Sequence, residues 1–156
     1  MTAVRLDRID AAILRLLQAD ARLTAQELSA RVGLSASQVA RRRQRLEETG
    51  VIRGWRAEVD PARVGIGVEA FVQVVMATHD RRQVADFVSR IRLVEEIVAA
   101  WTLTGASDYL LRLLCADLAA LNRLVQEVIL PHPAVSRVQS QIVLERLKEN
   151  GPVPLG

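Results

Sequence analysis

The sequence predicts an α+β chain made of two unlike parts. Through residues 1–50 apolar side chains recur at helical spacing. From residue 66 onward, segments in which every second residue is apolar, as in a strand, are interspersed with segments of helical spacing. The order of the second part is β-α-β-β-α-β, which is the ferredoxin-like arrangement of two helices packed on one face of an antiparallel sheet. The Asp60-Pro61 turn precedes the change of period, and we place the domain boundary near Gly65.

The N-terminal part predicts three helices joined by tight turns. Asp7 is a possible N-cap for the first helix, and the capping boxes TAQE (24–27) and SASQ (35–38) each begin a short helix. Gly33, between the boxes, can take the left-handed conformation that ends one helix and turns the chain into the next. Helix, glycine-containing turn and helix is the helix-turn-helix pattern. The apolar residues at helical spacing in the first helix are Leu6, Ile9, Ile13, Leu16 and Leu17, and those of the later seam are Leu28, Val32, Leu34 and Val39.

Gly50 stops the third helix, and residues 51–59 are expected to be a short extended segment. The predicted division is therefore a helix-turn-helix domain (1–54), a linker with a short strand (55–65), a ferredoxin-like domain (66–148) and a C-terminal tail (149–156).

The strands expected in the ferredoxin-like domain are VEAFVQVVMA (68–77), EEIVAAWTLT (95–104), DYLLRLLCA (108–116) and VSRVQSQIVLERL (135–147). The expected helices are 80–91 and 117–130, each with an aspartate as N-cap at its first position. Both faces of the strands carry apolar side chains: Val72 and Val74 lie on one face of the first strand, and Phe71 and Val75 on the other. Two helices cover only one face, so we expect the chain to dimerise through the other face of the sheet.

Composition limits the protein class. The 156 residues are 50% hydrophobic with a net charge of +3, and 12 arginines against 8 acidic residues place the basic excess in residues 1–65. Of the 21 basic residues only Lys148 is a lysine, and arginine suits bidentate contacts to phosphate and guanine, although a coding bias toward arginine stays open. The single cysteine, Cys115, fits a reducing compartment and a buried apolar role. The chain shows no signal peptide and no membrane-spanning run, so we expect a cytoplasmic protein that does not contact membranes.

The third helix is expected to read double-stranded DNA. When Val39 is taken as the centre of the buried stripe, Ser37, Arg41, Gln44 and Arg45 fall on the far side, with Gln38 beside them. The N-terminal half of such a helix enters the major groove, where Ser35, Ser37, Gln38 and Arg41 are base or phosphate readers. Arg45 is expected to clamp phosphate and Arg42, at the edge of the core, to reach a phosphate beside the groove. Gln38 is also a capping partner, which weakens its role as a base reader.

The whole pattern resembles the Lrp/AsnC family of transcriptional regulators. The matching pieces are LDRIDAAILRLLQADARLTAQELSARVGLSASQVARRRQRLEETGVIRGW, the βαββαβ part with TLTGASDYLL, and the closing IVLERLK. The resemblance implies a winged DNA-binding domain and an effector-sensing domain, assembly into dimers and then tetramers or octamers, and a small effector, typically an amino acid, bound between dimers. Besides this effector we expect no cofactor, and the lack of a C-x-x-C or H-E-x-x-H spacing predicts no metal site.

By this resemblance the sensing loop is Thr102 to Asp108. Gly105 lets the backbone approach a ligand closely, and Asp108 accepts from an ammonium group. Thr104 adds a hydroxyl, and Gln141 matches a position that faces the pocket. A simple turn role for Gly105 and a capping role for Asp108 stay open. One position departs from the family pattern: Arg43 stands where an aliphatic residue is usual, so we expect it to snorkel, to pair with an acid such as Glu47 or to contact phosphate.

Other functions stay open on the sequence alone. The chain can be an architectural DNA-compacting protein with no effector, its third helix can be only a solvated surface, or the helix-turn-helix can contact another protein. An enzyme is disfavoured because His79 and His132 are far apart and no metal-binding, phosphate-loop or nucleophile motif is present, so we expect no catalytic residues.

Overall fold

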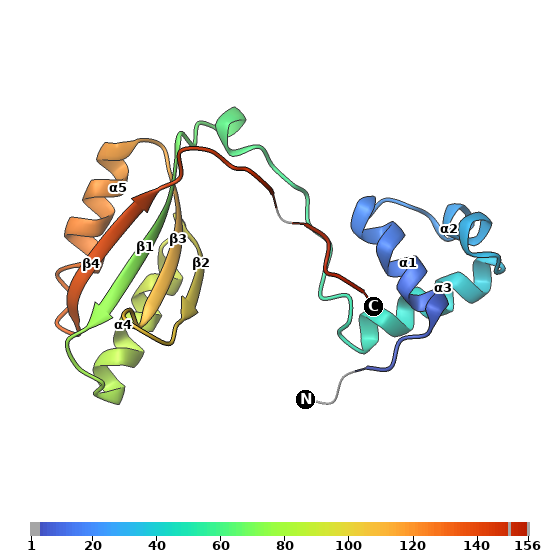
Figure 1. Ribbon diagram of the computed structural model, residues 1–156, viewed down its shortest axis with the longest axis horizontal. Coiled ribbons are helices and arrows are strands. Elements are labelled where there is room, and N and C mark those ends of the chain that lie inside the picture. Colours follow the sequence, from blue (N-terminus) through green and yellow to red (C-terminus); the bar gives the residue numbers. More distant parts are fainter. Residues whose placement is uncertain (1–3, 150, 156) are drawn as a thin grey trace. The chain divides into compact units, whose positions relative to one another are not determined.

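The computed structural model describes residues 4–149 and 151–155, which form two compact units. The first unit comprises Met1–Glu58 together with Lys148–Gly156, and the second comprises Val59–Leu147 (Figure 1). The C-terminal residues, which the sequence set apart as a tail, thus group with the N-terminal helices.

The first unit contains three helices, α1 (Arg8–Ala19), α2 (Ala25–Val32) and α3 (Ala36–Glu48). Both predicted capping boxes are present, and Asp7 forms a third one with Asp10. Gly33 has a φ of 70°, which confirms its left-handed turn between α2 and α3. The core of the unit is aliphatic and is formed by Ile13, Leu14, Leu17, Leu23, Leu28, Val39 and Leu46.

The expected strand between the two domains is not formed. Residues 53–60 have no regular secondary structure, and a single turn of 3-10 helix, η1 (Pro61–Val64), follows. An extended segment becomes a strand only beside another strand, and the described part of the first unit contains no strand. The predicted Asp60-Pro61 turn is present: the Asp60 carboxylate accepts from the N–H of Ala62 and caps η1.

The second unit has the predicted βαββαβ order. Its elements are β1 (Val68–Met76), α4 (Arg81–Leu93), β2 (Ile97–Thr102), β3 (Tyr109–Cys115), α5 (Leu118–Leu124) with one π-helical turn η2 (Val125–Ile129), and β4 (Val135–Ile142). The antiparallel sheet has the strand order β2-β3-β1-β4, and Asp80 and Asp117 cap the two helices as expected.

Two elements differ from their predicted extents by more than two residues at one end. The expected helix 117–130 changes from α to π geometry at Val125, where the N–H of Leu130 donates to the Val125 carbonyl just before Pro131. The last strand ends at Ile142 and does not continue to residue 147. The N–H of Val143 still donates to the Glu69 carbonyl, but β1 begins at Val68, so no strand remains to pair with later residues.

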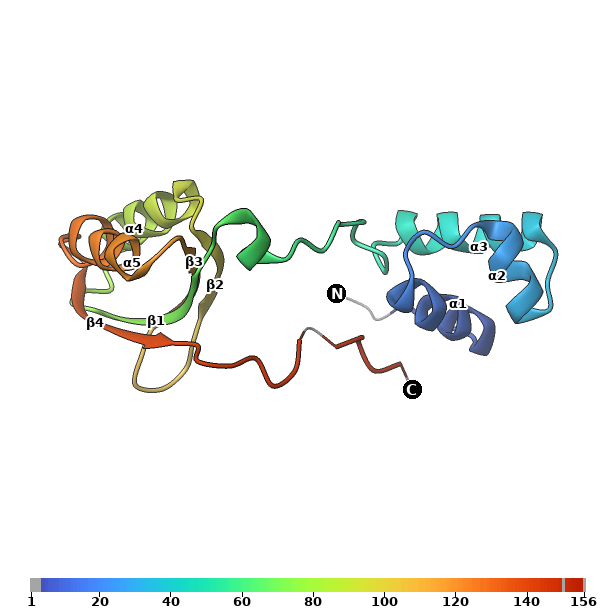
Figure 2. The ribbon, with the colours of Figure 1, turned by 90° about the horizontal axis from the view of Figure 1, so that it is seen from above.

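The sheet has one covered and one open face. Both α4 and α5 lie on the same side of it (Figure 2), and they bury Val72, Val74 and Leu111 completely. On the opposite side Phe71 and Leu110 remain half-buried with no helix over them. The predicted asymmetry of the sheet is therefore present in the single chain. Of the helices that the structure describes, none has the length and apolar character needed to cross a lipid bilayer.

Candidate DNA-binding and effector sites

Within the helix-turn-helix, the apolar packing of α3 uses one face of the helix. Leu28 of α2 and Val39 and Leu46 of α3 are 0% exposed and form the seam between the helices. Because Val39 and Leu46 are two turns apart on the same side of α3, the opposite side faces away from the core. Ser37, Arg41 and Gln44 are exposed on that side.

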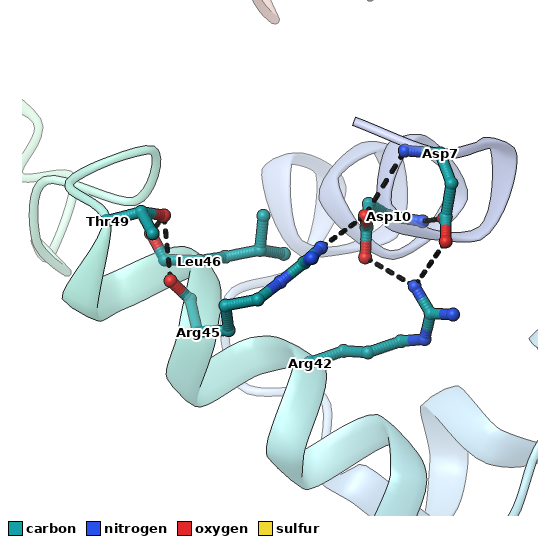
Figure 3. A network of polar contacts seen from close by, with 6 residues as sticks. All are labelled: Asp7, Asp10, Arg42, Arg45, Leu46 and Thr49. Carbon is teal, nitrogen blue, oxygen red and sulfur yellow. Dashed lines mark hydrogen bonds and ion pairs between the residues drawn. The ribbon is translucent and has the colours of Figure 1, made fainter. Parts of the chain in front are cut away.

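An ion-pair network around one buried carboxylate ties α3 to α1 (Figure 3). The carboxylate of Asp10, on α1, is 1% exposed and lies between two arginines of α3. The Arg42 Nη1 atom donates to Asp10 Oδ1 at 2.8 Å and to Asp7 Oδ2 at 2.6 Å. The Arg45 Nη2 atom donates to Asp10 Oδ2 at 2.5 Å. Both oxygens of the buried carboxylate are thus paired with cations from the helix that is expected to meet DNA.

The pairing has a physical reason. A carboxylate removed from water is costly unless cations and hydrogen-bond donors surround it. Asp7 adds to the network, since its own carboxylate accepts from the N–H of Asp10, and this bond together with Arg42 lowers the pKa of Asp7. Arg45, placed on the outward side by helical angles, instead bends toward α1. Arg42 and Arg45 therefore fix the packing of α3 in the free chain, whatever phosphate contacts they make.

The other predicted DNA-contacting residues also have local partners. The Ser35 hydroxyl accepts from the N–H of Gln38, and the Gln38 side-chain oxygen accepts from the N–H of Ser35, so both serve the capping box. The Ser37 hydroxyl lies 3.1 Å from that of Ser35. The Gln44 amide donates to Glu48 at 2.8 Å. In the part of the chain that the structure describes, no hydrogen bond or ion pair involves the side chain of Arg41.

The contacts of Arg43 explain how an arginine is accommodated at a position where an aliphatic residue is usual in the family. Its Nε atom lies 3.2 Å from Glu47, its Nη1 atom donates to the Leu23 carbonyl, and its guanidinium lies 4.5 Å from the centre of the Trp55 ring. The expected pairing with Glu47 is confirmed, and the stacking on Trp55 adds a cation–π contact. The CH2 groups and the planar guanidinium of Arg43 thus supply the packing that an aliphatic side chain would otherwise provide.

Sequence reasoning missed Asp10 as the partner of the arginines. The signal was present: Asp10 interrupts the apolar stripe of α1, one turn before Ile13 and Leu14. A carboxylate in a buried stripe demands cations from a neighbouring helix, and the nearest basic helix in the sequence is α3.

The expected effector loop lies between β2 and β3. Thr102 ends β2, and Thr104 and Gly105 are exposed in the loop. Gly105 has a φ of 111°, which favours glycine, and a Cβ atom there would meet nothing within 4 Å. The conformation of the chain alone thus explains this glycine, and the space above it is open.

Asp108 has a structural task. Its Oδ2 atom accepts from the N–H of Met76 at 2.7 Å, where the pairing of β1 with β4 shifts register. Its own N–H donates to the Val74 carbonyl, and its carbonyl accepts from Leu103. Asp108 thus stands at the start of β3 with a structural role for its side chain, which bonds the end of β1 and not the loop, and its other carboxylate oxygen has no hydrogen bond within the described residues.

Gln141 does not lie near Asp108 within one chain. Gln141 pairs with Phe71, whereas Asp108 contacts Val74 and Met76, three to five residues further along β1. At 3.4 Å per residue this is a separation of at least about 10 Å along the strand, and β3 and β4 also lie on opposite sides of β1. The structure therefore does not bring the five predicted effector residues together in a single chain. A polar pair that the sequence did not single out, Ser107 and Gln73, joins the loop to β1 at 3.0 Å.

A second charge network stands on the open face of the sheet. Arg112 of β3 and Arg146 donate to the two carboxylate oxygens of Glu69 at 2.5 and 2.6 Å. Burial alone would raise the pKa of Glu69, but the hydrogen bonds from the two arginines outweigh it and lower the pKa below its usual range.

The described residues also bear on whether the chain holds a metal site. No cluster of three or more histidine, cysteine or acidic side chains able to hold a metal is found among residues 4–149 and 151–155. Cys115 is 1% exposed, and burial raises the pKa of its thiol, as expected of a structural cysteine.

Comparison with known proteins gives the family. The family model described as winged helix-turn-helix DNA-binding matches residues 6–53, and that of the Lrp/AsnC ligand-binding domain matches residues 69–153. The chain belongs to the Lrp/AsnC family of transcriptional regulators. It is thus a DNA-binding transcriptional regulator with a ligand-binding domain, and not an enzyme.

Full-length Lrp/AsnC relatives are similar to this chain. The leucine-responsive regulatory protein of Rhizobium meliloti is 36% identical over 94% of each chain. The DNA-binding transcriptional activator DecR of Escherichia coli is 31% identical over 96% of this chain and 99% of its own. The crystal structure of a transcriptional regulator from Neisseria meningitidis in complex with L-methionine has a TM-score of 0.92, with 36% identity over 96% of this chain and 97% of that one.

The Asp10 network predicts a stability effect on the Lrp/AsnC DNA-binding unit. Asp10→Asn removes the charge between Arg42 and Arg45 and should lower the free energy of unfolding of this unit by about 2 kcal/mol, less than for a fully buried pair because both arginines are partly exposed. Urea denaturation followed by far-UV circular dichroism measures the change. Asp20→Asn, which breaks only the exposed pair with Arg22, is the control. Equal stability of the two variants would contradict this role for Asp10.

The Glu69 network predicts a pH dependence of stability in the ligand-binding domain. Because the folded-state pKa of Glu69 lies below its usual value of 4.5, the ionised carboxylate stabilises the fold above about pH 4.5, and this contribution is lost as the pH falls through the folded-state pKa. Glu69→Gln should cost about 2 kcal/mol at pH 7 and progressively less in acid. Denaturation curves from pH 7 down to pH 3 test this, with the exposed Glu95→Gln as control. A loss that does not change with pH would refute the argument.

Proposed function

We propose that this Lrp/AsnC regulator reads a specific DNA sequence by inserting α3 into the major groove, under the control of an amino acid. The proposal of DNA binding rests on the outward side of α3. Ser37, Arg41 and Gln44 are exposed there, on the side of the helix opposite the fully buried apolar seam. A helix held in this way presents its far side to base edges.

Arg41 is the proposed base reader of α3. Its side chain is exposed and engages no carboxylate in the described structure, so its guanidinium is available for the bidentate contact that arginine makes to guanine. Gln44 would need to give up Glu48 to contact adenine. Ser35, Ser37 and Gln38 lie at the N-terminal end of α3, which suits phosphate contact. Arg42 and Arg45, 26% and 49% exposed, remain candidates for phosphate contact in addition to their pairing with Asp10.

The proposed effector is an amino acid bound between protomers. The Neisseria relative, similar over nearly its whole length, is described in complex with L-methionine. In this chain Thr102, Thr104, Gly105 and Asp108 lie at one end of β3, whereas Gln141 lies elsewhere on the sheet. A site that uses both sets needs a second copy of the chain. This supports a pocket completed across an interface between dimers.

Dimerisation would use the open face of the sheet, where Phe71 and Leu110 lack a covering helix. Side chains of this kind gain free energy when a second sheet removes them from water. Further assembly into tetramers or octamers, and a cytoplasmic location beside the DNA, complete the proposal.

The DNA-reading role of Arg41 predicts a loss of sequence discrimination. In gel-shift titrations against the region upstream of the gene, Arg41→Ala should reduce the preference over random DNA by about tenfold or more, since one bidentate contact to a base is worth about 1–3 kcal/mol. Arg8→Ala, an exposed arginine at the start of α1, should keep that preference. If wild-type protein shows no preference over random DNA, the proposed function fails.

The effector proposal predicts a thermal shift with at least one of the twenty amino acids. A ligand at 100 times its Kd stabilises the folded state by about 2.7 kcal/mol, which raises the melting temperature measurably. Gln141→Ala should abolish the shift, and Gln139→Ala, an exposed glutamine on the same strand, should preserve it. No shift with any amino acid would favour an architectural DNA-compacting protein without an effector.

A further inference from the structure

The C-terminal segment, residues 151–155, is bound to α1 of the DNA-binding unit. The Gln18 side chain forms two hydrogen bonds with the backbone of Val153: it accepts from the N–H at 2.6 Å and donates to the carbonyl at 3.3 Å. The Arg15 Nη2 atom donates to the Leu155 carbonyl at 2.9 Å. Two side chains one turn apart on α1 thus hold three backbone groups of the segment.

Apolar contact accompanies these bonds. The Leu155 side chain packs against the core of the first unit. Val153 and Leu155 also line a cleft of about 660 Å³, whose other walls include Leu14 and Leu17 of α1 and residues 51–56. Val153 as a whole residue is 67% exposed, so its two backbone hydrogen bonds and the packed side chain of Leu155 carry the docking.

The sequence of the segment favours an ordered, extended form. Pro152 and Pro154 flank Val153, and each proline fixes its own φ near −65°. The unbound segment therefore has less conformational freedom to lose on docking than an ordinary chain end has.

The docking makes a second connection between the units. The chain leaves the first unit after Glu58, forms the second unit as Val59–Leu147, and returns to the first unit from Lys148. A chain end without contacts would fray from either unit. Here it returns to the helix that also carries Asp10, the partner of Arg42 and Arg45 on α3.

We propose that the docked C-terminal segment is a tether that couples the ligand-binding unit to the DNA-binding unit. With one linker, the two units reorient independently; a second attachment at α1 restricts them. A change in the position of β4, which is joined to the segment through residues 143–150, then acts on α1 and, through Asp10, on α3. The DNA part of this inference rests on the proposed function.

The test uses the full chain with Leu155→Asp, which places a charge in the apolar contact, and Gln18→Ala, which removes two hydrogen bonds. Val153→Asp is the matched control, because it changes an exposed side chain and leaves the backbone bonds in place. Hydrogen exchange at the Val153 amide measures docking. Protection in the wild type, its loss in the two variants and its retention in the control are expected. An unprotected wild-type amide would overturn the proposal.

Coupling is measured without DNA. Spin labels at Gln26→Cys on α2 and Arg82→Cys on α4, both exposed, report the distance distribution between the units. The buried Cys115 does not compete for the label, and unlabelled protein in excess removes distances between chains. Leu155→Asp and Gln18→Ala should broaden the distribution, and Val153→Asp should not. An unchanged width in both variants would overturn the tether.

A DNA measurement separates the tether from the proposed function. On DNA with two half-sites at a series of spacings, the wild type should prefer one spacing, and Leu155→Asp should lose that preference while it keeps its affinity for a single half-site. An unchanged spacing preference would also overturn the tether. Absence of any DNA binding by the wild type would instead refute the proposed function, and the spin-label result would still decide the tether.

Discussion

The buried carboxylate of Asp10 is the constraint on which the proposed DNA-binding face of α3 depends. A negative charge at 1% exposure must be surrounded by cations, and in the described structure these come from Arg42 and Arg45 of α3. The apolar seam through Val39 and Leu46 holds α3 against the core, but apolar contacts are non-directional. The two ion pairs have defined geometry, so they set the rotation of α3 about its axis and thereby which side chains face outward.

Much of the fold was predictable because its signals are local. The capping boxes at 24–27 and 35–38 and the glycine between them specify the ends of α2 and α3 within a few residues of chain. The alternation in β1 and β3 specifies which side chains face the helices. The family followed from the combination, and the comparisons agree with it.

The site was less predictable because its contacts are not local. Helical angles place the Cα–Cβ bond of Arg45 about 120° from the buried stripe, but a side chain with four rotatable bonds reaches sideways to Asp10 on another helix. Nothing in the residues around Asp108 indicated that its carboxylate accepts from the N–H of Met76, at the register shift that ends β1. No periodicity in the C-terminal residues indicated that Val153 and Leu155 meet α1, since that contact spans 135 residues or more.

The ion pairs that the arginines of α3 form within the chain also change how the positive charge of α3 would contribute to DNA binding. DNA carries a layer of condensed counterions, and the release of these ions drives much of its association with proteins. An arginine that is paired with a carboxylate of its own chain releases few counterions from DNA, unless that ion pair breaks on binding. α3 carries four arginines, of which Arg42, Arg43 and Arg45 are engaged by acids and Arg41 is not in the described structure. For the proposed DNA contact of α3, the entropy gained from freed ions is thus smaller than the arginine content of this helix suggests, and shape and hydrogen bonding would supply the rest.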